Sequence, residues 1–221
     1  MIDALLLSLA LLAQDGATTA AAAAPQPVDA AESTADTTVF DTDAALAQVN
    51  ASLNAIESLR ADFVQIAPDG SASRGVLSLR RPGRLRFEYA APSPLLVVAG
   101  GGTVAIQDSE LGTTDRAPLQ ATPLWWLLKD DVDLAADADI VDLTREDGFV
   151  YITLADQDGD MEGEVTFLFD AESYALSQWF AEDSLGLVTR VILENVETGI
   201  ELGPRLFVLD DAPDDRRDRR R

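Results

Sequence analysis

The sequence contains neither cysteine nor histidine among its 221 residues. Without cysteine there can be no disulfide, thiol nucleophile or thiolate metal site. Without histidine there is no Ser-His-Asp triad, no imidazole base and no zinc site of the usual kind. Basic residues are scarce as well: 39 acidic side chains face 16 basic ones, for a net charge of −23. This balance argues against sequence-independent nucleic-acid binding, which depends on neutralising phosphates. These absences exclude most enzyme classes.

The amino-terminal segment has the composition of an export signal. Residues 4–13 form a ten-residue apolar run, too short to cross a bilayer as a helix but typical of a signal-peptide core. A cleavable stretch of small residues, Ala20–Ala24, follows, so we expect a signal peptide over 1–24. The usual basic start is missing, because the first basic residue is Arg60, and we expect the true start to lie upstream. The alternative is a buried amino-terminal helix.

Composition divides the rest of the chain into three parts. The Ala/Pro/Thr-rich residues 25–40 are expected to form a flexible linker, 41–209 a single domain, and the Arg/Asp-rich residues 210–221 a disordered tail. The tail could also contact anionic lipid or a partner. No segment after the signal peptide is long and apolar enough to span a membrane, so we expect a soluble protein outside the cytoplasm.

Apolar periodicity predicts one helix followed by many strands. From Asp43 to Leu59 the apolar residues recur at helical spacing, with Thr42 or Asp43 as the cap. After Arg60 the period is two, with short turns such as Pro82-Gly83 and Asp147-Gly148 between strands. We expect strands at 61–67, 74–80, 84–89, 95–99, 103–108, 138–145, 149–155, 163–169, 175–181 and 187–195, and a weaker one near 205–209. Such short links imply antiparallel neighbours. The pattern therefore predicts a strongly curved or partly closed meandering sheet.

One apolar segment, residues 122–129, interrupts the strands. Thr122 at the N-cap and Pro123 in the first turn predict a short helix, and its next five residues are all apolar. Trp125 and Trp126 lie about 100° apart on a helix and cannot both face one ordinary core. The segment is either a buried helix wedged into the sheet or a lid across its mouth.

Several blocks of this sequence resemble the periplasmic outer-membrane lipoprotein carrier family, LolA. The strongest is Gly75–Tyr89, with Arg81-Pro82-Gly83-Arg84-Leu85-Arg86 at its centre and Pro92 after it. Weaker matches are Phe63-Val64-Gln65, Leu96-Val97-Val98, Gly101–Thr103, Thr122-Pro123 and Asp183-x-x-Gly186-x-x-Thr189. The similarity extends over about residues 43–209.

The resemblance implies a mainly β fold with an α lid, namely an unclosed, strongly curved antiparallel β-barrel of about ten or eleven strands covered by short helices. It implies a periplasmic chaperone whose hydrophobic cavity carries lipoprotein acyl chains from the inner to the outer membrane. The partners would be acylated lipoproteins, an inner-membrane ABC lipoprotein-releasing transporter and an outer-membrane receptor. We expect a monomer with no enzymatic activity, no cofactor, no metal and no nucleic-acid partner.

The resemblance also implies site residues. Arg81 matches the arginine that hydrogen-bonds backbone carbonyls of the lid helices and holds the empty cavity shut; the alternative is a solvated arginine in a basic strand. Candidate residues of the cavity wall are Phe63, Leu77, Leu79, Leu85, Phe87, Tyr89, Leu96, Trp125 and Trp126. Ordinary core packing is the alternative for them, since alternation does not tell which strand face is concave. The chain departs from the family at Ala105 and Gln107, where an aromatic pair is usual, and we expect this change to reshape the cavity.

Other functional interpretations are weighed against the carrier. The same fold could carry other lipids or apolar small molecules. The related acylated receptor is excluded because the chain lacks the cysteine that would anchor it. A carboxylate-based glycan hydrolase needs a defined pair of acids, and no motif singles one out. The acidic segment 156–164 fails the EF-hand spacing, because Phe167 occupies the place of the bidentate Glu, and is expected to be a hairpin loop.

Overall fold

Eleven antiparallel strands form one sheet in the order β6-β5-β4-β3-β2-β1-β11-β10-β9-β8-β7. The computed structural model describes residues 40–157 and 161–209. The strands are β1 (Ser58–Ile66), β2 (Ala72–Arg80), β3 (Arg84–Tyr89), β4 (Leu95–Gly100), β5 (Thr103–Asp108), β6 (Thr113–Pro118), β7 (Asp139–Glu146), β8 (Phe149–Ala155), β9 (Glu164–Asp170), β10 (Leu176–Glu182) and β11 (Val188–Thr198). The expected signal peptide at 1–24, the linker up to residue 39 and the tail at 210–221 lie outside the described residues.

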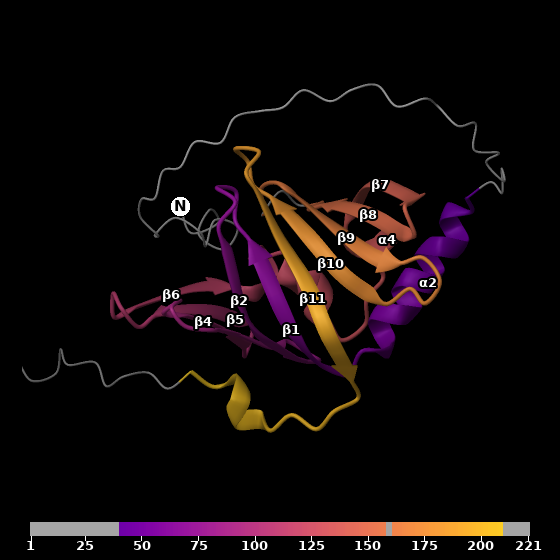
Figure 1. Cartoon of the computed structure of the whole chain (residues 1–221). Helices are drawn as coiled ribbons and strands as arrows, with labels where there is room; N and C mark the ends of the chain where they lie inside the picture. Colours follow the sequence, from indigo (N-terminus) through magenta and orange to yellow (C-terminus); the bar gives the residue numbers. More distant parts are fainter. Residues whose placement is uncertain (1–39, 158–160, 210–221) are drawn as a thin grey trace, which may run out of the picture.

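The sheet is curved but not closed. Consecutive strands pair with each other from β1 to β6 and from β7 to β11, and β1 also pairs with β11, so that the two ends of the chain's strand series meet in the middle of the sheet. The strands β6 and β7 are its two edges. Figure 1 shows the strand direction turning strongly between β11 and β6. The expectation of an unclosed antiparallel barrel of about ten or eleven strands is confirmed.

Three α-helices and two 3₁₀ turns accompany the sheet in the described part of the chain. They are α2 (Thr42–Ala55), η1 (Leu119–Ala121), α3 (Leu124–Leu128), α4 (Leu134–Asp137) and η2 (Pro204–Phe207). Helix α2 buries Ala45, Val49 and Leu53, and α3 buries Trp126, Leu127 and Leu128. All of these side chains except Ala45 belong to the same core cluster as the apolar face of the sheet. None of the helices described is long and apolar enough to cross a membrane.

Strand register defines the inner face of the sheet. Leu77 pairs with Phe87 and Leu79 with Leu85, and all four side chains are buried. Residues between them, such as Arg86 and Glu88, face outward. The alternation that the sequence shows in 74–80 and 84–89 therefore separates the core face from the outer face.

Gly75 marks a close approach within the inner face. It pairs with Phe63 across β1 and β2, and a Cβ at this position would lie 2.7 Å from the Phe63 ring and 2.1 Å from the Glu88 carbonyl oxygen. Only glycine leaves the Phe63 ring room to lie across the strand. Phe63 is consequently 1% exposed and supports the rings on β3.

The turn between β7 and β8 forms as the local sequence predicts. Asp147 and Gly148 have φ of 49° and 81°, and they join β7 to β8 as a two-residue hairpin link. Positive φ at both positions is the conformation that Asp-Gly favours between twisted strands.

Several expected boundaries are wrong, for tertiary reasons. Helix α2 ends at Ala55 instead of Leu59, because Ser58 and Leu59 pair with β2 and join β1. Its cap is Asp41, whose carboxylate accepts from the Ala44 amide, rather than Thr42 or Asp43. The strand expected near 205–209 is the 3₁₀ turn η2. The polar edge strand β6 and the short helix α4 were not expected, since neither has a clear apolar period.

Candidate functional site

The loop after β2 forms hydrogen bonds to the carboxyl end of α3. Arg81 Nε donates to the Leu127 carbonyl oxygen at 2.8 Å, and the Gly83 amide donates to the Leu128 carbonyl oxygen at 2.8 Å. The last carbonyls of a helix have no partner within the helix, so this loop supplies the missing donors. Arg81 therefore sits where the resemblance places it, against a carbonyl of the lid helix.

The buried position of the Arg81 guanidinium is energetically unfavourable for its charged form. Burial lowers its pKa to about 10, while the nearby Asp130 carboxylate acts in the opposite direction. The group is still charged at neutral pH. Of the buried side-chain polar atoms in 40–157 and 161–209, Nη1 of Arg81 is the one without a hydrogen-bond partner. A buried charged donor without a partner is unfavourable, so the closed arrangement is less stable than a fully bonded one would be.

Further contacts hold the same end of α3. The Lys129 ammonium forms an ion pair and hydrogen bond with Asp137 of α4, and the Trp126 indole donates to the Asp137 carbonyl oxygen at 3.2 Å. At the amino end, Thr122 Oγ1 donates to the Leu119 carbonyl oxygen instead of capping α3, and Pro123 is the N-cap residue. The expected cap role of Thr122 is wrong, because its hydroxyl turns back to η1.

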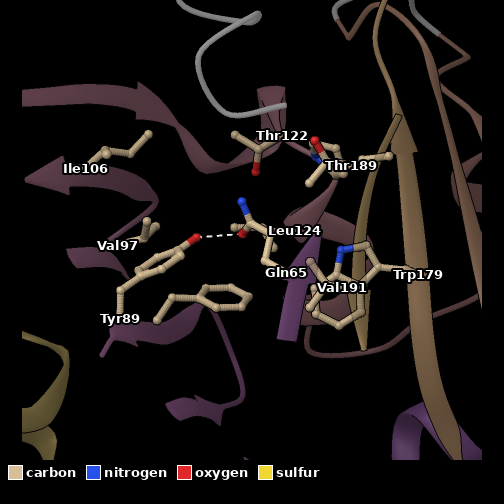
Figure 2. Close-up of a pocket in the computed structure, with 12 residues that line it drawn as sticks. Gln65, Tyr89, Val97, Ile106, Thr122, Leu124, Trp179, Thr189 and Val191 are labelled. Atoms are coloured by element: carbon tan, nitrogen blue, oxygen red, sulfur yellow. Dashed lines mark hydrogen bonds between the residues drawn. The ribbon is translucent and has the colours of Figure 1, made fainter. Parts of the chain in front are cut away.

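An apolar cavity of about 70 Å³ lies beneath the amino end of α3. Its walls come from β1, β3, β4, β5, β10 and β11, and the segment that leads into α3 covers it. Figure 2 shows the labelled side chains converging from these elements. The lining residues are Gln65, Phe87, Tyr89, Val97, Ile106, Thr122, Pro123, Leu124, Trp179, Ala181, Thr189 and Val191. The cavity and the Arg81 hydrogen bond thus lie at opposite ends of one short helix.

Aromatic rings form one wall of the cavity. Phe63 meets Phe87 at 5.0 Å and Tyr89 at 5.1 Å between ring centroids, both edge to face. Phe87 meets Trp179 at 6.3 Å in the same manner. Such pairs are favourable and geometrically specific, so this wall is preorganised in the empty protein.

A few polar groups interrupt the apolar lining. Tyr89 Oη donates to Gln65 Oε1 at 2.7 Å (Figure 2). Burial raises the pKa of Tyr89 above its usual value, so its hydroxyl is protonated over the whole physiological range. Thr122 and Thr189 add hydroxyls on the lid side and on β11. Apolar pockets with a small number of placed polar groups are typical of ligand sites.

The candidate wall residues divide into four groups. Phe87 and Tyr89 line the cavity, and Phe63 packs directly behind them. Trp125 is half-buried and packs against the core. The other four inward-facing candidates are buried in the core beside the cavity and do not line it: Leu77, Leu79, Leu85 and Trp126. Each of these faces the interior.

The prediction that Leu96 belongs to the cavity wall is wrong. Leu96 pairs with Glu88 on β3 and with Gln107 on β5, so it lies on the outer face, opposite to Phe87 and Val97. The same register places Ala105 and Gln107 outside, so their departure from the family pattern does not reshape the cavity wall. A run of apolar residues on β4 concealed the alternation that identifies the inner face.

Sequence reasoning missed most of the second wall. Trp179 and Ala181 on β10, with Thr189 and Val191 on β11, reach the cavity because β11 pairs with the distant strand β1 and with its neighbour β10. Their alternation was visible, but nothing local indicated that β11 would pair with β1. Gln65 appeared only as part of a motif.

No cluster of three or more acidic side chains within the described ranges could hold a metal ion. The acidic segment 156–164 joins β8 to β9, as a hairpin loop would, although residues 158–160 lie outside the described part. Asp156 Oδ2 accepts from the Met161 amide at 3.2 Å, which is a local turn contact.

An open antiparallel sheet with a short helix over an apolar cavity defines a class of folds that enclose a space between sheet and helix. Known sequences agree with this description. Residues 54–210 match the family model described as "Outer membrane lipoprotein carrier protein LolA". The chain belongs to the LolA family.

Two relatives identified by sequence lead to the same assignment. The chain is 32% identical over 165 residues to an outer-membrane lipoprotein carrier protein of Methylococcus capsulatus, covering 70% of this chain and 78% of that protein. It is 30% identical over 173 residues to the protein of the same name from Dechloromonas aromatica, covering 74% and 82%. Among solved structures, a LolA superfamily protein from Nitrosomonas europaea aligns over 78% of this chain and 99% of that chain, with a TM-score of 0.47 and 11% identity.

Proposed function

We propose that this protein is a periplasmic chaperone that binds the acyl chains of lipoproteins and carries them from the inner to the outer membrane. The observation that carries the proposal is the apolar cavity beneath α3, closed by Arg81. Exposing an acyl chain to water costs ~0.8 kcal/mol per CH₂, so the chain needs an apolar container to cross an aqueous compartment. Family membership and the names of the relatives support the choice of cargo.

The empty form has to open before cargo can enter. A cavity of about 70 Å³ is far smaller than the ~300–1,000 Å³ of typical ligand pockets. Lifting α3 away from the inner face would join the cavity to the space now filled by Trp126, Leu127 and Leu128. The bonds of Arg81 and Gly83 to the end of α3 oppose this movement and would re-form when cargo leaves.

Because these bonds stabilise the closed, empty form relative to the open, loaded form, they favour release of the cargo. An inner-membrane ABC transporter would supply the energy for loading, and a receptor at the outer membrane would take the cargo as the latch re-forms. Binding and carrying require no catalytic group, and the protein would act as a monomer without a cofactor.

A release assay tests the proposal. Spheroplasts that display newly made lipoproteins are incubated with purified protein without detergent, and lipoprotein in the supernatant is measured. We expect release, and a complex of about one cargo per carrier by native mass spectrometry. A small lipid as the native occupant, with no lipoprotein released, would instead indicate a carrier of other lipids.

Two matched variants localise the activity. Phe87→Glu places a carboxylate in the cavity wall, where burying it without a partner is costly, so release should be lost. Leu187→Glu makes the same change at a side chain that is 43% exposed, and release should be kept. Equal release by both variants would contradict the cavity as the binding site.

A further inference from the structure

Gln65 is a buried amide in the wall of an otherwise apolar cavity. It is 8% exposed, and it faces inward because it pairs with Val191 of β11, another lining residue. Burying an amide is unfavourable unless its donors and acceptors find partners. An apolar side chain of similar length would fill the same space without this cost.

The orientation of the amide is set by Tyr89. The tyrosine hydroxyl donates to Oε1 at 2.7 Å, so the amide oxygen faces Tyr89 and the amide nitrogen faces the other way. Figure 2 shows that nitrogen directed across the cavity toward Thr122. The nitrogen carries two N–H donors, and the neighbouring side chains of Phe87, Trp179 and Val191 offer no acceptor, because the Trp179 indole can only donate. The hydroxyl that the nitrogen faces, Thr122 Oγ1, itself donates to the Leu119 carbonyl oxygen.

An acyl chain always begins at a carbonyl group, which accepts hydrogen bonds and donates none. We propose that Gln65 Nε2 donates to the ester or amide carbonyl at the head of a bound acyl chain. The hydrocarbon would then extend along Phe87 and Trp179. This inference rests on the proposed function, and it makes Gln65 the residue that distinguishes an acyl chain from a plain alkyl chain.

The position of Gln65 suits this role in the opening movement. Thr122, which precedes α3, and Leu124, the first residue of α3, line the cavity together with Gln65 in the closed form. Lifting this part of the chain uncovers the amide donors at the same time as the aromatic wall. The carbonyl of the cargo then takes the place of the lid opposite Gln65, which anchors the head of the chain at a fixed depth.

The alternative is that Gln65 exists only to accept the bond from Tyr89. The two roles predict different ligand preferences. If Gln65 only accepts the bond from Tyr89, the affinity for a ligand should not depend on whether the ligand has a carbonyl group. A pair of ligands that differ only in that carbonyl separates them.

The experiment uses the full chain and two soluble peptides. One carries two ester-linked palmitoyl chains on a glyceryl group, and the other carries two ether-linked hexadecyl chains on the same group. Affinities are measured by competition with a fluorescent fatty-acid probe. We expect the wild type to bind the ester peptide about three- to tenfold more tightly than the ether peptide, the factor that one net hydrogen bond provides.

Substitutions then assign the preference to one side chain. Gln65→Leu and Gln65→Met remove the donors, and both should bring the ester-to-ether ratio close to one. Gln178→Leu is the matched control, because Gln178 is equally buried, at 7% exposed, but pairs with Ile192 on the outer side of β10. The ratio should be unchanged there. Comparing two ligands within each variant cancels any loss of folded protein.

The outcomes separate the two proposals. If the wild type binds neither peptide, the proposed function fails. If it binds both peptides equally well, the carrier function stands and the role of Gln65 is wrong. A preference that survives in both Gln65 variants would also overturn the inference.

Discussion

At the scale of single residues, we propose that Arg81 holds α3 in place over the cavity. Its one side-chain bond to the lid comes from Nε to the Leu127 carbonyl, in a site that is only partly exposed. Replacing it with leucine should destabilise the closed form relative to the open one by about 1–3 kcal/mol, because the helix carbonyl loses a charged donor. We expect Arg81→Leu to bind acyl peptides more tightly and to release them to an acceptor more slowly.

Arg145→Leu is the control for this prediction. Arg145 is exposed on the edge strand β7, and it donates to the Ala171 carbonyl oxygen at 3.3 Å, away from α3. Fluorescent-probe affinity and transfer rate should match the wild type in this variant. If Arg81→Leu also matches the wild type while remaining folded, Arg81 does not act as a latch.

Tyr89 provides a test by pH. Its folded-state pKa is raised by burial, so above pH 10 the unfolded chain loses this proton while the folded chain keeps it. The unfolded state then binds fewer protons, and the contribution of Tyr89 to stability, fully present below pH 10, is lost as pH rises. The stability of the wild type relative to Tyr89→Phe should fall by up to about 1.4 kcal/mol per pH unit above pH 10.

Urea denaturation of both proteins between pH 8 and 11.5 measures this difference. Arg81 also has a shifted pKa, but it is common to both proteins and cancels in the comparison. Parallel stability curves would mean that the Tyr89 hydroxyl ionises as freely in the folded protein as in the unfolded chain.

At the scale of elements, α2 holds the segment that follows the lid. Asn54 donates from Nδ2 to the Val132 carbonyl oxygen at 2.9 Å and accepts from the Val132 amide at 2.8 Å. Asn50 accepts only from the Leu134 amide, at 3.2 Å. This connection fixes the chain between α3 and α4, and it limits how far the carboxyl end of α3 can move.

Two alanine variants measure how much each asparagine contributes to this connection. Asn54→Ala removes two hydrogen bonds and should cost about 1–3 kcal/mol of stability, whereas Asn50→Ala removes one and should cost about half as much. Hydrogen exchange at the Val132 amide should accelerate strongly in Asn54→Ala and little in Asn50→Ala. Equal effects, or none, would show that α2 does not restrain this segment.

At the scale of the whole molecule, every tryptophan of the chain reports on the lid or the cavity. The sequence has three, of which Trp125 and Trp126 lie on α3 and Trp179 lines the cavity. An acyl peptide with bromine in its chains should therefore quench much of the intrinsic fluorescence, because bromine quenches only at close range. The same peptide without bromine is the control.

Trp179→Phe should remove the largest share of that quenching, since Phe87 and Trp179 form the wall along which the chain extends. Aqueous iodide should quench the empty protein weakly, because Trp126 and Trp179 are 2% and 6% exposed. Equal fluorescence with brominated and plain chains would place the binding site elsewhere.

The sequence by itself determined most of the strands and the family of this protein. Alternation in residues 74–80 and 84–89 separated Leu77, Leu79, Leu85 and Phe87 from the arginines between them, because a strand has a strict period of two. Turn chemistry at Asp147-Gly148 is equally local. The Arg81–Arg86 block identified the family and, through it, predicted the contact of Arg81 with a carbonyl of α3.

Only the tertiary structure decided which side chains form the cavity. The pairing of β1 with β11 brings Gln65 beside Val191, and no local signal encodes a contact between strands that far apart in the chain. The tertiary structure also placed Leu96 outside the site. In an apolar run such as Leu95–Val98 the sequence does not show which residues face inward, and only the pairing of Leu96 with Glu88 and Gln107 fixes its orientation. A period belongs to one strand, whereas a cavity depends on how several strands and a helix pack together, so the sequence predicted the wall residues of β3 and not the space that they enclose.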